Sequence, residues 1–144
     1  MNRLYGYVPV SKDYAPELIV TIPAGIVARK RSLGGGPVSL SADTFDKYVG
    51  ASNLPVVIDF WARWCSLSKA MAPHFATGAR KLAGRAMFAK VETDQEASLA
   101  ARYGIECIPA LVVLRNGQEI ERHCGAMTAG QLVLWLQPHL RKTT

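Results

Sequence analysis

Short apolar runs at residues 56–62, 86–91 and 110–114 are the strongest pattern in the chain. Each run is bounded by turn-forming or polar residues and is too short for a buried helix, so each predicts a strand. The first run is apolar on both faces, which is typical of a central strand covered by helices on both sides. Residues 37–40 predict a short further strand. Asn116-Gly117 predicts a tight hairpin turn into an antiparallel strand over 118–123.

Amphipathic segments separate these strands and follow the last of them. Apolar residues at helical spacing predict helices over residues 41–49, 68–82, 94–103 and 128–140. Pro73 lies inside the second of these helices and predicts a bend there, because proline cannot donate to the carbonyl four residues earlier. The resulting order, β-α-β-α-β-α-β-β-α, predicts an α/β fold with a central mixed sheet flanked by helices.

A glycine-rich segment, residues 34–36, precedes the first predicted strand and is flexible by composition. It predicts a boundary between an N-terminal extension with its linker, residues 1–36, and one domain, residues 37–144. Within the extension, residues 17–22 and 26–28 resemble two short strands, which could form a small hairpin or an extended arm that packs on the main domain.

Composition excludes several classes of protein. The chain is 49% hydrophobic and 19% charged, which is typical of a globular protein. Its net charge of +6 includes one dense basic run, residues 29–31, which we interpret as a solvated loop and not as a nucleic-acid site. No segment has the roughly 20 apolar residues that span a bilayer, and the N-terminus lacks the pattern of a secretory signal. We therefore expect a cytoplasmic protein with no membrane or nucleic-acid partner.

Three cysteines, Cys65, Cys107 and Cys124, make neither a disulfide scaffold nor a zinc-binding pattern, so we expect no metal or other cofactor. Cys65 stands out because it lies between a predicted strand and a predicted helix. Unpaired N–H groups and the positive end of the helix dipole favour a thiolate at such a position. The sequence therefore predicts that Cys65 is a nucleophile.

The residues around Cys65 resemble the active site of the thioredoxin family, in which Trp-Cys-Gly-Pro-Cys-Lys follows a Val-Asp-Phe-Trp-Ala strand. The positions kept in this chain are Asp59, Phe60, Trp61, Ala62, Trp64, Cys65 and Lys69. Three positions differ: Ser66 and Leu67 replace Gly-Pro, and Ser68 replaces the second cysteine. The resemblance covers residues 37–140 and implies a thioredoxin fold.

Further matches imply roles for residues far from Cys65. Ile108-Pro109 resembles the family's Ile-Pro pair, in which the proline is cis and faces the active-site cysteine. Gly125-Ala126 resembles the pair that lines the substrate groove, and Asp59 and Lys90 resemble the buried carboxylate and lysine behind the active site.

The chain looks especially similar to the second type of bacterial thioredoxin. It has no cysteine before Cys65, so the N-terminal zinc module of that type is not carried over.

The resemblance implies a thiol–disulfide oxidoreductase that acts on protein disulfides. Cys65, Ser68, Asp59 and Lys90 are the expected catalytic positions. The expected substrate-binding residues are Trp64, Ser66, Leu67, Ile108, Pro109, Gly125 and Ala126. A buried Asp59 should have a raised pKa and could relay a proton.

Ser68 limits this chemistry. A hydroxyl cannot attack the mixed disulfide that Cys65 would form with a substrate. Two origins stay open: a natural monothiol Cys-x-x-Ser site, or a substitution made to trap substrates. The simultaneous absence of Gly-Pro favours the natural site, since trapping needs only one change. Turnover would then need an external reductant, either glutathione or a thioredoxin reductase.

Cys107 is a candidate accessory thiol because it lies two residues before Pro109. It could resolve a mixed disulfide on Cys65 or join two chains, although we expect a monomer in which Cys107 is an inert neighbour. Cys124 is interpreted as a packing residue.

Two alternative functions stay open. The first is a redox-inactive protein-binding module with a thioredoxin fold. The second is a monothiol glutaredoxin-like protein that uses glutathione or an iron–sulfur cluster. The tryptophan before Cys65 and the absence of that family's Gly-Phe pair argue against the second.

Overall fold

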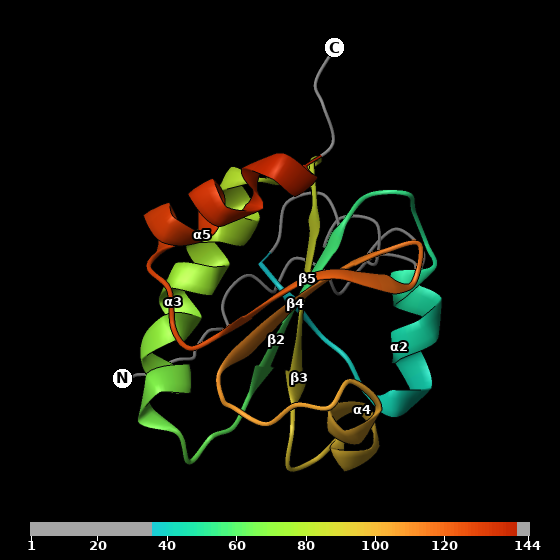
Figure 1. Ribbon diagram of the computed structural model, residues 1–144, viewed down its shortest axis with the longest axis vertical. Helices are drawn as coiled ribbons and strands as arrows, with labels where there is room; N and C mark the ends of the chain where they lie inside the picture. Colours follow the sequence, from blue (N-terminus) through green and yellow to red (C-terminus); the bar gives the residue numbers. More distant parts are fainter. Residues whose placement is uncertain (1–35, 141–144) are drawn as a thin grey trace, which may run out of the picture.

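A computed structural model of the chain describes residues 36–140 (Figure 1). The predicted strands at 17–22 and 26–28, the basic run at 29–31 and most of the predicted linker lie outside the described residues. Within residues 36–140 the strands are β1 (Val38–Ser39), β2 (Val56–Trp61), β3 (Met87–Glu92), β4 (Ala110–Arg115) and β5 (Gln118–Cys124). The helices are α2 (Ala42–Val49), α3 (Ser66–Lys81), α4 (Ala97–Arg102) and α5 (Ala129–Leu136), followed by the 3₁₀ turn η2 (Gln137–His139).

The strands form one mixed sheet in the order β1-β3-β2-β4-β5. β2 pairs in parallel with β3 and antiparallel with β4, so it lies at the centre of the sheet. β4 and β5 form the predicted hairpin, and Asn116 and Gly117 at its tip both have positive φ angles, 53° and 81°. Such angles are those of the tight turn that this dipeptide favours. The predicted α/β fold with a central mixed sheet is confirmed.

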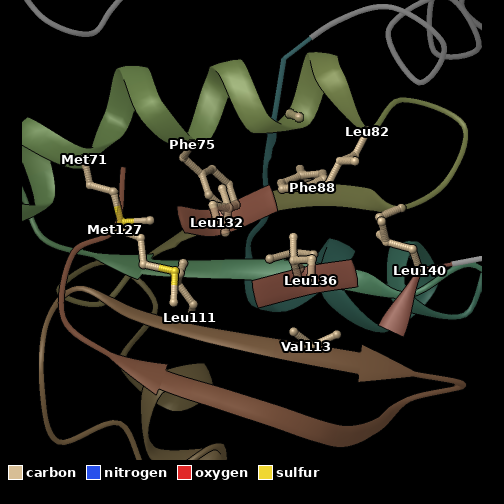
Figure 2. Packing of buried hydrophobic residues seen from close by; sticks show 13 residues of the cluster. Met71, Phe75, Leu82, Phe88, Leu111, Val113, Met127, Leu132, Leu136 and Leu140 are labelled. Carbon is tan, nitrogen blue, oxygen red and sulfur yellow. The ribbon is translucent and has the colours of Figure 1, made fainter. Parts of the chain in front are cut away.

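Helices cover both faces of the sheet: α3 and α5 lie on one face, and α2 and α4 lie on the other (Figure 1). Two buried apolar clusters fill these layers. Figure 2 shows the cluster under α3 and α5, where Phe75 and Leu132 pack against Phe88 of β3. Each of these side chains is at least 96% removed from solvent. Burial of such side chains supplies the main driving force for this fold.

Two helix boundaries differ from the prediction. α4 begins at Ala97 and not at residue 94, because residues 93–95 form a turn. α5 ends at Leu136 and gives way to a 3₁₀ turn that contains Pro138, a residue that cannot donate a helical hydrogen bond. Pro73 lies within α3, which is assigned without interruption; the bend expected there stays a prediction. No helix within residues 36–140 has the length and apolar character needed to cross a membrane.

The N-terminus of α5 has its donors satisfied by side chains. The Thr128 hydroxyl accepts a hydrogen bond from the Gln131 amide at 3.2 Å, and the Gln131 side chain accepts one from the Thr128 amide at 2.9 Å. The His74 ring of α3 accepts a third, from the Ala129 amide at 3.1 Å. These contacts fix the start of α5 beside α3.

Replacing Thr128 with alanine is expected to lower the free energy of unfolding by about 1 kcal/mol, because one capping acceptor is lost. Urea denaturation of the two proteins measures the difference. Thr128→Ser keeps the hydroxyl and is the matched control, with an expected cost near zero. Equal stability of the alanine and serine variants would contradict the capping role.

Candidate active site

Cys65 lies where the central strand passes into α3. β2 ends at Trp61, a short turn follows, and Cys65 is the N-cap of α3 with φ −95° and ψ 115°. Its amide donates to the Ala62 carbonyl at 3.1 Å, and its own carbonyl accepts from the Lys69 amide at 3.1 Å. The predicted position at a strand-to-helix junction is confirmed. The helix starts two residues earlier than residue 68, so Ser66 and Leu67 form its first turn.

The thiol of Cys65 is free and half-buried. Its sulfur lies 3.6 Å from the carbonyl oxygen of Ile108, to which the thiol donates. The Ile108-Pro109 peptide bond is cis, as the sequence resemblance implied. Two segments that are 43 residues apart therefore meet at the sulfur.

Gly125 completes this surface from the end of the β4–β5 hairpin. Its amide donates to the Pro109 carbonyl at 2.8 Å, and its φ of 110° lies in a region that L side chains rarely adopt. The structure thus brings Cys65, Ile108, Pro109 and Gly125 together. Ala126 is exposed directly after Gly125.

Apolar side chains project into solvent on either side of Cys65. Trp64 is 65% exposed and Leu67 is 56% exposed, while Ser66 between them is also exposed. The Trp64 indole donates to the Asp94 carboxylate at 2.8 Å, so the ring is held in place although it is open to solvent. The contact of Asp94 with Trp64 was not predicted from the sequence, in which Asp94 was interpreted as the start of a helix. Trp64 and Leu67 therefore give the segment around Cys65 two large exposed apolar side chains.

Ser68 points inward from the first turn of α3. It is 1% exposed, and its hydroxyl accepts a hydrogen bond from the Ala62 amide at 3.4 Å. The hydroxyl therefore occupies a buried position one helical turn from Cys65. No sulfur other than that of Cys65 belongs to this motif.

Asp59 is buried within β2, directly opposite Lys90 of β3. Neither of its carboxylate oxygens has a hydrogen-bond partner, so Ser68 does not donate to it. Burial raises the pKa of Asp59 to about 6, and the nearby Lys90 charge opposes the rise. Burial also lowers the pKa of Lys90, whose ammonium lies 4.7 Å from the centre of the Trp61 ring. The expected raised pKa of Asp59 is confirmed.

The buried Asp59 makes stability depend on pH. Its folded-state pKa of about 6 exceeds the ordinary value of 3.8, so the folded protein binds this proton more tightly than the unfolded chain does. Stability is then highest below 3.8 and falls as the pH rises through 6, by about 3 kcal/mol in total.

Asp59→Asn should remove this dependence, so the stability of the variant relative to the native protein should rise by about 2 kcal/mol from about pH 4 to about pH 8. Urea denaturation at both pH values measures the change, and any constant cost of the buried amide cancels. Asp43→Asn, at an exposed position of α2, is the matched control for the loss of one carboxylate. A difference that is the same at both pH values would contradict the account.

The remaining two cysteines correct the sequence interpretation. Cys107 and Cys124 form a disulfide bond, with their Cα atoms 5.9 Å apart. The interpretation of Cys124 as a packing residue is wrong, and Cys107 is neither an inert neighbour nor a free accessory thiol in this state. The physical reason is the β4–β5 register, which pairs Cys124 with Ala110 and so places it beside the segment that carries Cys107. Cys107 directly precedes Ile108-Pro109, and Cys124 directly precedes Gly125-Ala126. Both pairs were expected to bind substrate, so the sequence already indicated that the two cysteines lie near each other.

Within residues 36–140, no three His, Cys, Asp or Glu side chains lie together in a group that could hold a metal ion.

Comparison with known proteins gives a consistent result. The family model described as Thioredoxin matches residues 36–138. Thioredoxin C-3 of Corynebacterium nephridii is 37% identical over 106 residues, which cover 74% of this chain and 72% of that protein. Thioredoxin 1 of Nostoc sp. is 36% identical over 97 residues, covering 67% of this chain and 91% of that protein. The thioredoxin of Haemophilus influenzae is 32% identical over 96 residues, or 67% and 90% of the two chains.

Proposed function

This chain belongs to the thioredoxin family, and with it to a group of thiol–disulfide oxidoreductases; on that premise we propose that Cys65 alone makes the covalent bond to a protein disulfide substrate. The Cys65 thiolate attacks one sulfur of the substrate disulfide, a mixed disulfide forms, and the other sulfur leaves as a thiolate that takes up a proton. Substrate is thereby held on Cys65, and one substrate thiol is released.

The position of Cys65 is the observation that carries this proposal. Cys65 is the N-cap residue of a 16-residue helix and its thiol is free, so the side chain starts at the positive end of the helix dipole. Cys65 is also half-buried and not enclosed, so a disulfide can reach it. The position of Cys65 thus combines a helix N-terminus with access for a substrate disulfide, and a cysteine nucleophile needs both.

Ser68 supports a monothiol cycle. The serine is buried one turn from Cys65 with its hydroxyl hydrogen-bonded to the Ala62 amide, and an alcohol cannot form a disulfide with the substrate-bound sulfur. Release of the held substrate requires a thiol from outside residues 65–68. Glutathione or a thioredoxin reductase is the class of reductant that fits.

Substrate recognition is proposed for the surface around Cys65. Exposed Trp64 and Leu67 offer apolar contact, and Ser66 lies between them. On the other side of the sulfur, the main chain at Ile108 and at Gly125-Ala126 would pair with an extended peptide by strand addition, while buried Pro109 holds the two segments together by accepting from the Gly125 amide. Asp59 and Lys90 are proposed to support proton movement behind the sulfur.

A redox-inactive binding module is the second candidate, and Ser68 is the observation that favours it. Such a module would use the same exposed Trp64 and Leu67 but would leave the disulfide of its partner intact. A disulfide-linked dimer through Cys107 gains no support, because Cys107 is bonded to Cys124 of the same chain.

Mixing a disulfide-bonded peptide with the chain, in which Cys65 is reduced and the Cys107–Cys124 disulfide is kept intact, distinguishes the two candidates. The proposal predicts release of peptide thiol, detected with a chromogenic thiol reagent, in proportion to the protein added. A binding module predicts peptide binding with no thiol release. Binding without release would overturn the proposed function.

A further inference from the structure

The Cys107–Cys124 disulfide joins the two segments that flank Cys65. Cys107 directly precedes the cis pair Ile108-Pro109, and Cys124 directly precedes Gly125. The hydrogen bond from the Gly125 amide to the Pro109 carbonyl, at 2.8 Å, ties the same two segments. A second pair of sulfurs is therefore built into the surface that surrounds the free thiol.

Cys107 lies close to Cys65 in space. The Ile108 carbonyl oxygen is 3.6 Å from the Cys65 sulfur, so the Cα of the neighbouring Cys107 is at most about 10 Å from that sulfur. Bonded cysteines have Cα atoms about 4.4–6.8 Å apart, so the Cys107 segment would move towards Cys65 for a disulfide to form between the two. The segment that must move, residues 105–109, is irregular and lies between α4 and β4. The bond to Cys124 restrains it, and reduction of that bond leaves the hydrogen bond between Gly125 and Pro109 as the remaining tie between the two segments.

The pair is also open to a reductant. Cys124 is exposed and ends β5, the edge strand of the sheet, while Cys107 is half-buried. Exposed disulfides are the ones that exchange with external thiols. A reductant can therefore convert the pair to two thiols without opening the core.

We propose that Cys107 and Cys124, when reduced, supply the resolving thiols that Ser68 cannot supply. This inference rests on the proposed function, in which Cys65 holds the substrate as a mixed disulfide. The Cys107 thiolate attacks the Cys65 sulfur of that mixed disulfide, a Cys65–Cys107 bond forms, and the substrate leaves as a thiol. The Cys124 thiolate then attacks Cys107, a Cys107–Cys124 bond forms, and Cys65 leaves as a thiolate.

The electrons balance across this sequence. The substrate disulfide gains two electrons and two protons and becomes two thiols. The Cys107 and Cys124 thiols lose the same electrons and protons and become the disulfide seen in the structure, while Cys65 ends as it began. A small dithiol, or a reductase that carries one, then reduces the Cys107–Cys124 disulfide and starts the next cycle.

Single-turnover oxidation of the fully reduced chain tests the proposal. The full-length protein is reduced, freed of reductant and mixed with one equivalent of glutathione disulfide. Acid and N-ethylmaleimide stop the reaction at successive times, and intact mass with non-reducing peptide mapping locates each bond. The native chain is compared with Cys124→Ser, with Cys65→Ser and with the double variant Cys107→Ser, Cys124→Ser.

Each protein has its own expected end state. The native chain should end with Cys65 free and a Cys107–Cys124 disulfide, after a brief glutathione adduct on Cys65. Cys124→Ser should accumulate a Cys65–Cys107 bond, because no third thiol remains. The double variant should keep glutathione on Cys65 about tenfold longer than the native chain or more. Cys65→Ser should form the Cys107–Cys124 disulfide about tenfold more slowly or worse.

Two results would overturn the inference while leaving the proposed function intact. One is an adduct on Cys65 that lasts as long in the native chain as in the double variant. The other is formation of the Cys107–Cys124 disulfide at the native rate in Cys65→Ser, a comparison that needs no change at either paired cysteine. A folded double variant that never forms an adduct on Cys65 would overturn the proposed function, and the inference with it.

Discussion

Replacement of Ser68 by cysteine is expected to raise the turnover of protein-disulfide reduction by about a hundredfold or more, because an intramolecular thiol replaces one that must diffuse in. Position 68 lies in the first turn of α3, one turn from Cys65, and its side chain is directed inward. A thiol there could attack the mixed disulfide on Cys65 directly. The variant is best made in the chain that also carries Cys107→Ser and Cys124→Ser, so that no other internal thiol contributes.

The rate of reduction of a protein disulfide, with a small dithiol as the final reductant, measures this effect. Ser68→Ala in the same background is the matched control, since it removes the hydroxyl without adding a thiol, and its rate should stay at the starting level. A folded Ser68→Cys protein with no gain over Ser68→Ala would show that the rest of the site is not arranged for reduction.

Replacement of Cys65 by serine should abolish the release of thiol from a disulfide-bonded peptide, down to the rate without protein, because the only thiol outside the Cys107–Cys124 disulfide is lost. Non-covalent binding of a peptide that lacks cysteine should change by less than about threefold, or under about 1 kcal/mol. The exposed side chains of Trp64 and Leu67 are unaltered by the change. Loss of chemistry with retention of binding is thus the expected pattern.

Both quantities are accessible on one sample, with thiol release followed by absorbance and binding followed by tryptophan fluorescence, to which the exposed Trp64 contributes. Leu67→Ala is the matched comparison, since it removes an exposed apolar contact and leaves the sulfur in place. It should weaken binding and spare the chemical step. Thiol release that survives in Cys65→Ser, with the Cys107–Cys124 bond kept oxidised, would assign the chemistry to another group.

Much of the fold follows from local sequence signals. The apolar run that became β2 is buried from Val56 to Phe60, and the dipeptide Asn116-Gly117 has the positive φ angles of its predicted turn. These signals depend on interactions within a few residues of each other, so they can be recognised without tertiary structure. The cis bond at Ile108-Pro109 was different, since only the resemblance to a family implied it.

Helix ends were harder to predict because they depend on distant partners. Asp94 looked like the start of a helix, yet its carboxylate accepts from the Trp64 indole 30 residues earlier in the chain. The helix therefore starts only at Ala97, after the turn that presents Asp94. A contact between a carboxylate and an exposed indole does not produce a regular pattern of apolar and polar residues, so it cannot be recognised from the sequence.

The candidate site likewise has some features that the sequence predicted and one that depends on contacts between distant residues. Cys65 was predicted from its place after a strand, and the buried Asp59 was implied by the resemblance to a family; both lie where expected. The bond between Cys107 and Cys124 was missed because it depends on the pairing of β4 with β5, which brings residues 17 positions apart within bonding distance. The disulfide could have been predicted by first placing Ile108-Pro109 and Gly125-Ala126 next to each other and only then interpreting the cysteine before each pair.

The central claim is that the motif at residues 65–68 makes a covalent bond to substrate and cannot break it. The most direct test keeps the Cys107–Cys124 disulfide oxidised, reacts the native chain with a disulfide-bonded peptide, and measures intact mass and a non-reducing peptide map over time. The account predicts one peptide per chain, bonded to Cys65, which persists until a thiol is added. Absence of the adduct, a bond at any residue other than Cys65, or spontaneous release of the peptide would contradict it.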